Sequence, residues 1–438
     1  MRTRIIFLRA KEYITFDWRH LSLLIYFAMR VRNLFKRGDA HLPSHLVVLG
    51  TIWRSATLSN IRIRCEKDLK KLDLRFGEQK VAKAFETICV SKNSPELSRQ
   101  LRDTVQLGKL PFKNRLIILK APSAYEKGVL VMSFTHFFPY FMDLIDPSIF
   151  DSYHLVLEPS WVGAFTPDWL LFRKIPHKIW IQSCESRDND FLRSIALNLI
   201  PIPDVTANCW THPDLFKPLP GEDKVYDLAV VSGWADFKRH YILFEAMRKI
   251  GIQSFRVACA GMRMEHNLDH MKHLAEHYGV LDQVDFFEAL PPAELNVILN
   301  RSKAHALFSR KEGYNRATIE AMFAGVPSFI REGMNYGMTY PYTNGISGDF
   351  YNEKKLPEFL KKIHGNGFAS MNPRNWVMEN MSPRISTERL ERAIFGDMQN
   401  RLKIKVNAPE FAYFNPGDRT ELEGAYADLQ RFLKKNQA

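Results

Sequence analysis

The segment 304–327 constrains the fold of this chain more than any other stretch of its sequence. Residues 304–308 form an apolar run of strand length, and a polar, glycine-containing loop follows. Asn315 fits the N-cap of a helix that ends near Gly325 and Pro327. This order predicts an open α/β sheet in which a helix begins beside the carboxyl end of a strand. Ligands bind at that edge of such sheets, and the positive end of a helix dipole favours phosphate.

Two carboxylates, Glu312 and Glu320, are placed eight residues apart in the loop and the helix. An eight-residue step along one helix rotates about 80° and climbs about 12 Å, so a single helix would not place them side by side. Because Glu312 lies in the loop, both side chains can reach one elongated ligand at different points. Without further context, such a pair is more often one solvated loop acid and one surface acid.

The same segment resembles the Glu-x7-Glu motif of retaining GT-B glycosyltransferases, especially glycosyltransferase family 4. The matching residues are Glu312-Gly313, Glu320-Ala321-Met322 and Ala324-Gly325-Val326-Pro327. The resemblance implies that Glu312 contacts the donor sugar and that Glu320 holds the ribose hydroxyls of the nucleotide.

The resemblance also implies that the backbone near the helix start receives the donor diphosphate. The residues placed there are Gly313, Tyr314, Asn315 and Arg316. The family usually has a small apolar pair after the aromatic residue, and this chain has Asn315-Arg316 instead. Arg316 therefore either adds a phosphate contact or faces solvent.

Lys238 lies in the loop after a predicted strand, 227–231, at the position where the family has its diphosphate-binding lysine. When the bond to a nucleotide diphosphate breaks, negative charge grows on the leaving phosphate, and a preorganised cation stabilises it. The family commonly has an arginine five residues earlier, where this chain has Gly233-Trp234. Arg239 or Arg316 would then supply the missing charge. Without the resemblance, an exposed Lys-Arg pair is usually solvated.

The N-terminal half contains candidate acceptor-binding residues after three predicted strands, 129–134, 154–157 and 178–182. His136 would orient or polarise a sugar hydroxyl, and it is a candidate catalytic residue. Glu158 and Trp161 would offer a carboxylate and a stacking platform to an acceptor sugar. A loop histidine, or an aromatic residue after a proline, is more often structural.

Asp188-Asn189-Asp190 matches the Asp-x-Asp pattern with which GT-A glycosyltransferases hold a divalent metal. Two closely spaced acids are common, and these precede an apolar helix, so we interpret them as a turn and a helix start. No metal and no cofactor are expected, since by resemblance the leaving phosphate itself accepts the acceptor proton.

The net charge of +13, from 61 basic and 48 acidic residues, permits attraction to nucleic acid, to an anionic membrane or to a phosphorylated substrate. No nucleic acid is expected, because the sequence has no recognisable recognition helix or zinc finger. The apolar run 21–29 is too short to span about 30 Å of hydrocarbon. The apolar face of 21–35 fits an interfacial helix on an anionic leaflet and equally a helix docked on the protein core.

Five scattered cysteines without a Cys-x-x-Cys pair favour buried thiols in a reducing cytoplasm. We therefore expect a cytoplasmic protein. If 21–35 forms an interfacial helix, the protein would also contact the inner face of the cytoplasmic membrane.

The predicted fold is α/β of the GT-B type, with two Rossmann-like doubly wound domains facing a cleft and a proline-rich linker at 201–220. Residues 1–125 would be a basic helical extension packed with the first domain. The acceptor domain would cover 126–215, and the five-stranded donor domain 221–365. Helices in 366–438 would cross back to the first domain.

The predicted function is retaining transfer of a sugar from a nucleotide diphosphate sugar to a glycan or lipid-linked acceptor, in polysaccharide or glycolipid synthesis. One alternative is a noncatalytic GT-B subunit of a polysaccharide assembly. A weaker one, based only on charge, is a nucleic-acid-binding protein.

Overall fold

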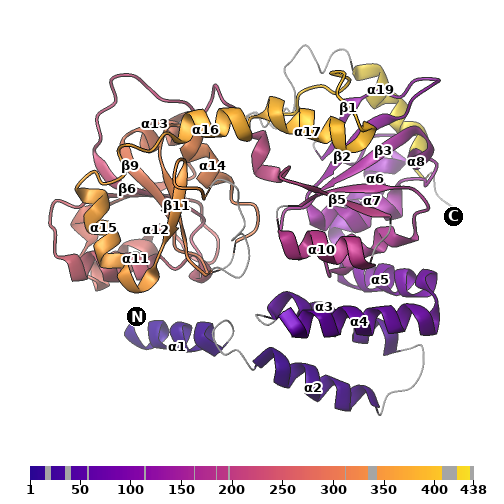
Figure 1. Ribbon diagram of the computed structural model, residues 1–438, viewed down its shortest axis with the longest axis horizontal. Coiled ribbons are helices and arrows are strands. Elements are labelled where there is room, and N and C mark those ends of the chain that lie inside the picture. The colour runs from indigo at the N-terminus through magenta and orange to yellow at the C-terminus, as the bar shows by residue number, and fades with distance from the viewer. Residues whose placement is uncertain are drawn as a thin grey trace. The chain divides into compact units, whose positions relative to one another are not determined.

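The protein is described here by a computed structural model that covers residues 1–14, 21–34, 41–56, 59–112, 115–161, 163–183, 185–195, 198–310, 312–333, 343–406 and 422–434. The chain divides into two compact units, each built around one sheet (Figure 1). The N-sheet unit comprises Lys11–Ala207, Thr387–Lys405 and Ala412–Ala438. The C-sheet unit comprises Met1–Ala10, Asn208–Ser386 and Val406–Phe411. The boundary at Ala207 lies within the stretch predicted as a linker.

The N-sheet unit contains a five-stranded sheet whose strands lie in chain order, β1-β2-β3-β4-β5. β1 is antiparallel to β2, and the remaining pairs are parallel. The strands are β1 Leu116–Lys120, β2 Gly128–Ser133, β3 Tyr153–Glu158, β4 Ile179–Ser183 and β5 Leu199–Pro203. Every residue of β2 and β4 is buried, as expected of parallel strands covered on both faces. The three strands predicted in this half are confirmed. β5 was not predicted, because it contains two prolines, which are uncommon within strands.

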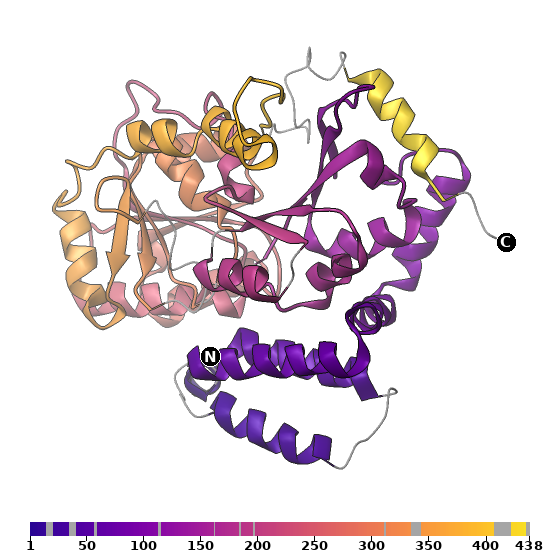
Figure 2. The ribbon, with the colours of Figure 1, turned by 45° about the vertical axis from the view of Figure 1, so that its right-hand side comes forward.

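Helices from the N-terminal region complete the N-sheet unit. α3 and α4 lie beyond α5 and α10 on one side of the sheet, as Figure 2 also shows. The core of this layer includes Trp53, fully buried against Phe165 and Phe191. Residues 41–125, which contain no chemical motif, therefore supply much of the core of this unit. The helices are α2 Leu21–Leu34, α3 Leu42–Ser55, α4 Ser59–Phe76, α5 Glu78–Lys92, α6 Pro95–Gln106, α7 Phe138–Leu144, α8 Ile149–Ser152, α9 Pro167–Leu170, α10 Ser186–Ile195 and α19 Glu423–Asp428.

The C-sheet unit contains a parallel sheet of six strands, one more than predicted, in the order β11-β10-β9-β6-β7-β8. From β6 the chain proceeds through β7 to β8 at one edge, and β9 then returns to the other side of β6. The order of strands thus reverses between β6 and β9, as in doubly wound folds, whose ligands bind outside the strand ends at this switch point. The strands are β6 Tyr226–Val231, β7 Val257–Gly261, β8 Val284–Glu288, β9 Ser302–Leu307, β10 Ser328–Arg331 and β11 Gly348–Tyr351.

Among the described residues, six helices connect or follow these strands, and a seventh continues into the N-sheet unit. They are α11 His240–Ile250, α12 Leu268–His277, α13 Pro292–Asn300, α14 Arg316–Phe323, α15 Leu356–His364 and α16 Pro373–Asn380. α17, Pro383–Phe395, begins in the C-sheet unit and ends in the N-sheet unit.

The first helix corrects the predicted position of the N-terminus. α1, Arg2–Glu12, was expected to pack with the first domain, but residues Met1–Ala10 belong to the C-sheet unit. Ile5 is buried in the apolar core of that unit, and Arg9 forms an ion pair with Glu245. Apolar burial and charge pairing together explain this docking, which helical periodicity alone did not reveal.

α2 is partly docked on its own unit. The Tyr26 side chain is buried, and its hydroxyl donates to Asp68 at 2.7 Å. Leu24, Ile25 and Phe27 are exposed. Lys36 and Arg37, the basic residues that follow α2, lie outside the described residues. No helix in the described part of the chain is long and apolar enough to cross a membrane.

Four cysteines, Cys65, Cys89, Cys209 and Cys259, are buried free thiols, as predicted, and Cys184 lies outside the described residues.

Candidate active site

Lys238 and Glu312 meet at the switch point of the C-sheet. Lys238 ends a short 3-10 turn, Asp236–Lys238, after β6, and Glu312 lies in the loop after the neighbouring strand β9. The Lys238 Nζ donates to the Glu312 Oε1 at 2.6 Å, and the two side chains are only 11% and 7% exposed. The fold therefore brings together two residues that sequence analysis had placed on one ligand, although they are 74 positions apart.

The start of α14 is organised as predicted. The Asn315 side chain caps the helix, because its Oδ1 accepts the Thr318 N–H at 3.0 Å. The Asn315 carbonyl accepts from the Asn208 Nδ2 at 3.3 Å, which fixes the cap from outside the helix. The first N–H groups of a helix have no intrahelical partners, and they carry the positive end of its dipole. This end of α14 can receive an anion.

Glu320 lies inside α14 and is buried. Burial raises the pKa of its carboxyl group, and the nearby Arg316 opposes that shift. Arg316 is half exposed, with its Nη2 3.7 Å from the Glu320 Oε1. Arg316 thus faces solvent and also lies at the helix start, where it could contact a phosphate. The ion pair that it makes in this structure is with Glu320.

Arg239 is held in a buried ion pair. Its backbone is left-handed, with φ 59° and ψ 36°, and its side chain is 3% exposed. Its guanidinium donates to both carboxylate oxygens of Glu353, at 2.8 and 2.9 Å, and to the Phe308 carbonyl at 3.1 Å. Although burial opposes the shift, Arg239 and Arg331 lower the pKa of Glu353 to about 2. Arg239 is therefore a poorer source of charge for a ligand than sequence analysis suggested.

Three polar residues near the switch point were missed from the sequence: the partly buried Glu353 and the buried His240 and Ser309. Glu353 follows β11 and is far from any motif. His240 is buried, with its Nε2 3.3 Å from the Ser232 Oγ, and burial together with Lys238 lowers its pKa to about 3. Ser309, three residues before Glu312, is buried, and its hydroxyl has no hydrogen-bond partner in the described part of the chain. A buried unpaired hydroxyl at a strand end marks a place where a ligand group could bind.

The neighbours Gly313 and Tyr314 follow Glu312 in the same loop, where Gly313 is partly exposed and Tyr314 is buried. Both residues lie between Glu312 and the α14 cap. Their role in donor binding stays a prediction.

The N-sheet places its candidate residues at one edge, since Ser133 at the end of β2 is in register with Glu158 at the end of β3. Glu158 is buried, and it accepts from the Ser133 Oγ at 3.0 Å and from the fully buried Lys405 Nζ at 2.7 Å. This ion pair gives Glu158 a structural partner that the sequence did not indicate, because 247 positions separate the two residues. Its acceptor-binding role stays a prediction.

His136 and Trp161 are more accessible. His136 is exposed, its ring is tilted against Phe137 with centroids 4.2 Å apart, and partial burial together with Arg115 lowers its pKa. Its imidazole is therefore neutral at pH 7. Trp161 is 39% exposed, so part of its side chain is accessible.

The predicted helix start at Asp188 is confirmed. Asp188 lies in the first turn of α10 and is fully buried. Its carboxylate oxygens accept the N–H groups of Gly163 and Ala164 at 2.8 and 2.9 Å. These hydrogen bonds hold the backbone of Gly163 and Ala164 in place.

Comparison with known proteins identifies the C-sheet unit. Residues 214–364 match the family model described as "Glycosyl transferases group 1". This part of the chain is therefore similar to a glycosyltransferase group 1 domain, and the match supports a glycosyltransferase. A search of curated proteins found no match.

Several solved structures are similar to parts of the chain. TarM is 15% identical, with a TM-score of 0.46, over 61% of this chain and 54% of that one. HepE of Anabaena, solved with UDP and glucose, is 13% identical, with a TM-score of 0.45, over 57% of this chain and 73% of that one. Sucrose-phosphate synthase from Thermosynechococcus elongatus is 17% identical, with a TM-score of 0.43, over 56% and 69%. The chain spans about half the length of TarM.

Proposed function

We propose that this protein is a retaining GT-B glycosyltransferase that moves a sugar from a nucleotide diphosphate sugar to an acceptor hydroxyl. The observation that carries the proposal is the contact between Lys238 and Glu312 at the switch point of a glycosyltransferase group 1 domain. A cation and a carboxylate at this edge, beside a helix start, suit a ligand that has both a diphosphate and a sugar.

Each residue has a distinct part in this proposal. The start of α14 and Lys238 bind the diphosphate, and Lys238 stabilises the charge that grows on it as the glycosidic bond breaks. Glu320, one turn further along α14, accepts hydrogen bonds from the ribose hydroxyls, and Glu312 contacts the sugar. The leaving phosphate accepts the acceptor proton, so the reaction needs no protein base and no metal.

Without donor, Glu312 neutralises Lys238 in an ion pair whose two side chains are almost entirely buried. Burying a lysine is costly unless it is paired, so this contact keeps the cation in place for the diphosphate. Donor binding then shares Lys238 between the diphosphate and Glu312, and releases part of the carboxylate for the sugar hydroxyls.

The acceptor would be a glycan or a lipid-linked sugar bound at the edge of the N-sheet, near His136 and Trp161. The exposed Leu24, Ile25 and Phe27 of α2, together with the net charge of +13, support peripheral contact with an anionic membrane on the cytoplasmic side. Synthesis of a cell-surface polysaccharide or glycolipid would combine these features.

One observation favours a second candidate, a noncatalytic GT-B subunit of a polysaccharide assembly. The family arginine is replaced by Gly233-Trp234, and Arg239, its nearest substitute, is engaged with Glu353. A noncatalytic subunit could retain donor binding, but it would release no nucleoside diphosphate.

A panel of nucleotide diphosphate sugars tests both candidates in two steps. Thermal unfolding should show stabilisation by one donor, about 2.7 kcal/mol at 100 times its Kd. Release of nucleoside diphosphate from that donor, in the presence of glycan and lipid-linked acceptors, then identifies an enzyme, and NMR of the product identifies retention. Stabilisation without release supports the noncatalytic subunit, and no stabilisation by any donor contradicts both.

A further inference from the structure

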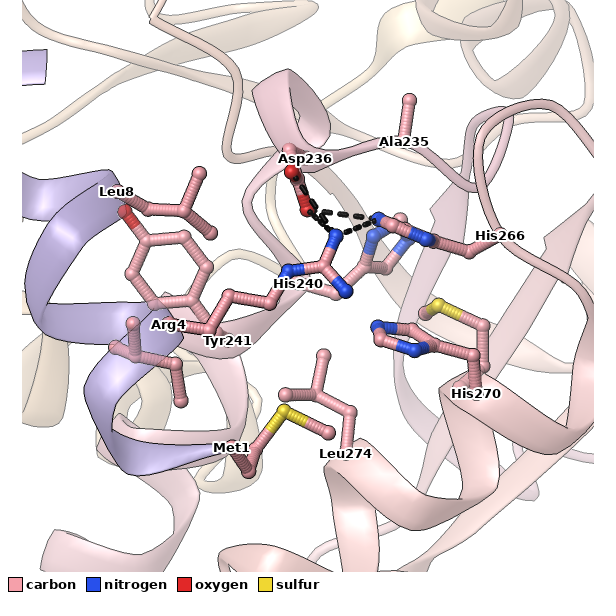
Figure 3. Close-up of a pocket in the computed structure, with 12 residues that line it drawn as sticks. Met1, Arg4, Leu8, Ala235, Asp236, His240, Tyr241, His266, His270 and Leu274 are labelled. Carbon is pink, nitrogen blue, oxygen red and sulfur yellow. Dashed lines mark hydrogen bonds and ion pairs between the residues drawn. The ribbon is translucent and has the colours of Figure 1, made fainter. Parts of the chain in front are cut away.

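A small cavity, mostly apolar but with a polar side formed by Arg4, Asp236 and His266, lies between α1 and the loops after β6 and β7. Its volume is about 20 Å³, room for about one water molecule or one ion. Figure 3 shows the Arg4 side chain entering it from α1, toward Asp236 and His266, with His270 beside His266. Leu274 and other apolar side chains line the rest, so the polar groups gather on one side.

The Arg4 guanidinium is held by atoms that are themselves metal-ligand types. Its Nη2 lies 3.1 and 3.2 Å from the two carboxylate oxygens of Asp236, and 3.3 Å from the His266 Nε2. The His266 Nε2 is also 2.7 Å from the Asp236 Oδ1. The Glu265 carboxylate approaches the same residue and accepts the Asp236 N–H at 2.9 Å. The Arg4 Nη2 thus lies between the Asp236 carboxylate and the His266 imidazole.

We propose that Asp236, Glu265 and His266 form a binding site for a divalent transition metal of the zinc type, and that Arg4 is its built-in competitor. In the described part of the chain, these residues offer three ligand atoms that all lie within 4.8 Å of one another. One imidazole nitrogen and two carboxylate oxygens are ligands that Zn²⁺ takes at about 2.0–2.2 Å, with water in an open position.

The fold fixes the three ligands on two adjacent loops. Asp236 follows β6, whereas Glu265 and His266 follow its parallel neighbour β7 and directly precede the α12 cap, Asn267. The His266 ring stacks on His270, with centroids 4.0 Å apart and planes 19° apart. This stacking restricts the imidazole, so the exposed Glu265 is the ligand that must move to close the set once the guanidinium leaves.

Competition between the metal and Arg4 gives the proposal a distinctive consequence. The guanidinium and the ion need the same Asp236 oxygens, so each must weaken the binding of the other. The Arg4–Asp236 pair is partly exposed, with 44% and 31% of the side chains accessible, so its loss should change metal affinity only modestly. Asp236 lies two residues before Lys238, but the site is defined by metal binding alone and does not depend on sugar transfer.

The test is Zn²⁺ titration of chelator-stripped, full-length protein without any nucleotide sugar, by calorimetry and by competition with a metal-sensitive dye. Wild type should bind one Zn²⁺ at this site, and Arg4→Ala should bind it about two- to fivefold more tightly. Glu265→Gln, at an exposed position, and His266→Ala should each weaken binding by about tenfold or more. His273→Ala, which changes an exposed histidine on α12, is the matched control and should leave the affinity unchanged.

Cobalt substitution distinguishes this site from the cysteines. Co²⁺ bound by carboxylate and imidazole lacks the thiolate charge-transfer band that cysteine ligation produces. The proposal is overturned if neither wild type nor Arg4→Ala binds Zn²⁺, if Glu265→Gln and His266→Ala bind as wild type does, or if the Co²⁺ spectrum shows thiolate ligation. A failed glycosyl-transfer assay would leave these outcomes unaffected, so the two proposals fail separately.

Discussion

Replacing Glu312 with glutamine should tighten the binding of a nucleoside diphosphate while slowing sugar transfer. In the unliganded structure, Glu312 neutralises Lys238 through a contact of 2.6 Å between side chains that are about nine-tenths buried. A diphosphate must compete with Glu312 for the lysine, and Glu312→Gln keeps the shape of the side chain but removes its charge. The variant therefore offers the diphosphate a less engaged cation.

The size of this effect follows from the contact. Hydrogen bonds to charged groups contribute about 1.5–3 kcal/mol, and a neutral amide retains part of that interaction. A gain of about 1.4 kcal/mol corresponds to a tenfold tighter Kd, which we take as the upper end of the expected change. Transfer should fall by about 100-fold, because Glu312 is proposed to act on the sugar during bond cleavage.

Calorimetry with the nucleoside diphosphate and with its sugar donor separates these effects. The diphosphate lacks the sugar, so its affinity reports only the competition for Lys238, whereas the donor also loses its contact with Glu312. Glu320→Gln removes the other buried carboxylate without freeing Lys238, so it should weaken nucleoside diphosphate binding rather than tighten it. Equal or weaker binding of the diphosphate by Glu312→Gln would refute the competition.

The remaining predictions concern other parts of the account. Lys238→Ala should lower kcat by about 100-fold or more with the fold retained, and wild-type turnover in that variant would exclude its role. Glu320→Gln should weaken nucleotide binding about tenfold or more. Burial raises the pKa of Glu320, so on acidification the wild type should begin to lose nucleotide affinity at a pH above about 4.3, the ordinary glutamate pKa. Glu353 has a folded pKa of about 2, below the unfolded value, so its contribution of about 3 kcal/mol is present above about pH 4.3 and is lost as the pH falls toward 2. Glu353→Gln should flatten this acid limb in chemical denaturation, and an unchanged limb would contradict the assignment. Wild type should co-sediment with anionic vesicles at low salt, and Leu24→Ser/Phe27→Ser should not; absence of binding by wild type would exclude the membrane contact.

Local signals predicted the C-sheet unit well. The apolar run before the loop, the cap at Asn315 and the glycine at 325 each act within a few residues, so the sequence alone predicts the strand, the helix start and the helix stop. Gly325 has a φ of +82°, the conformation that ends helices with glycine. Recognition of a familiar spacing then selected Lys238 and Glu312 among many charged residues.

Long-range pairings could not be predicted from these signals. Lys405 reaches Glu158 from the other end of the chain, and Arg239 pairs with Glu353, 114 positions away. The docking of α1 depends on Ile5 entering a core assembled by distant elements. None of these contacts leaves a periodic pattern or a motif, because each is set by tertiary packing and charge neutralisation.

The most direct test of the central claim is a crystal structure of the protein with the nucleoside diphosphate that stabilises it most. We predict a diphosphate within hydrogen-bond distance of the Lys238 Nζ and of the backbone N–H groups at the start of α14, with the ribose hydroxyls on Glu320. A nucleotide bound elsewhere, with Lys238 still paired only to Glu312, would contradict it.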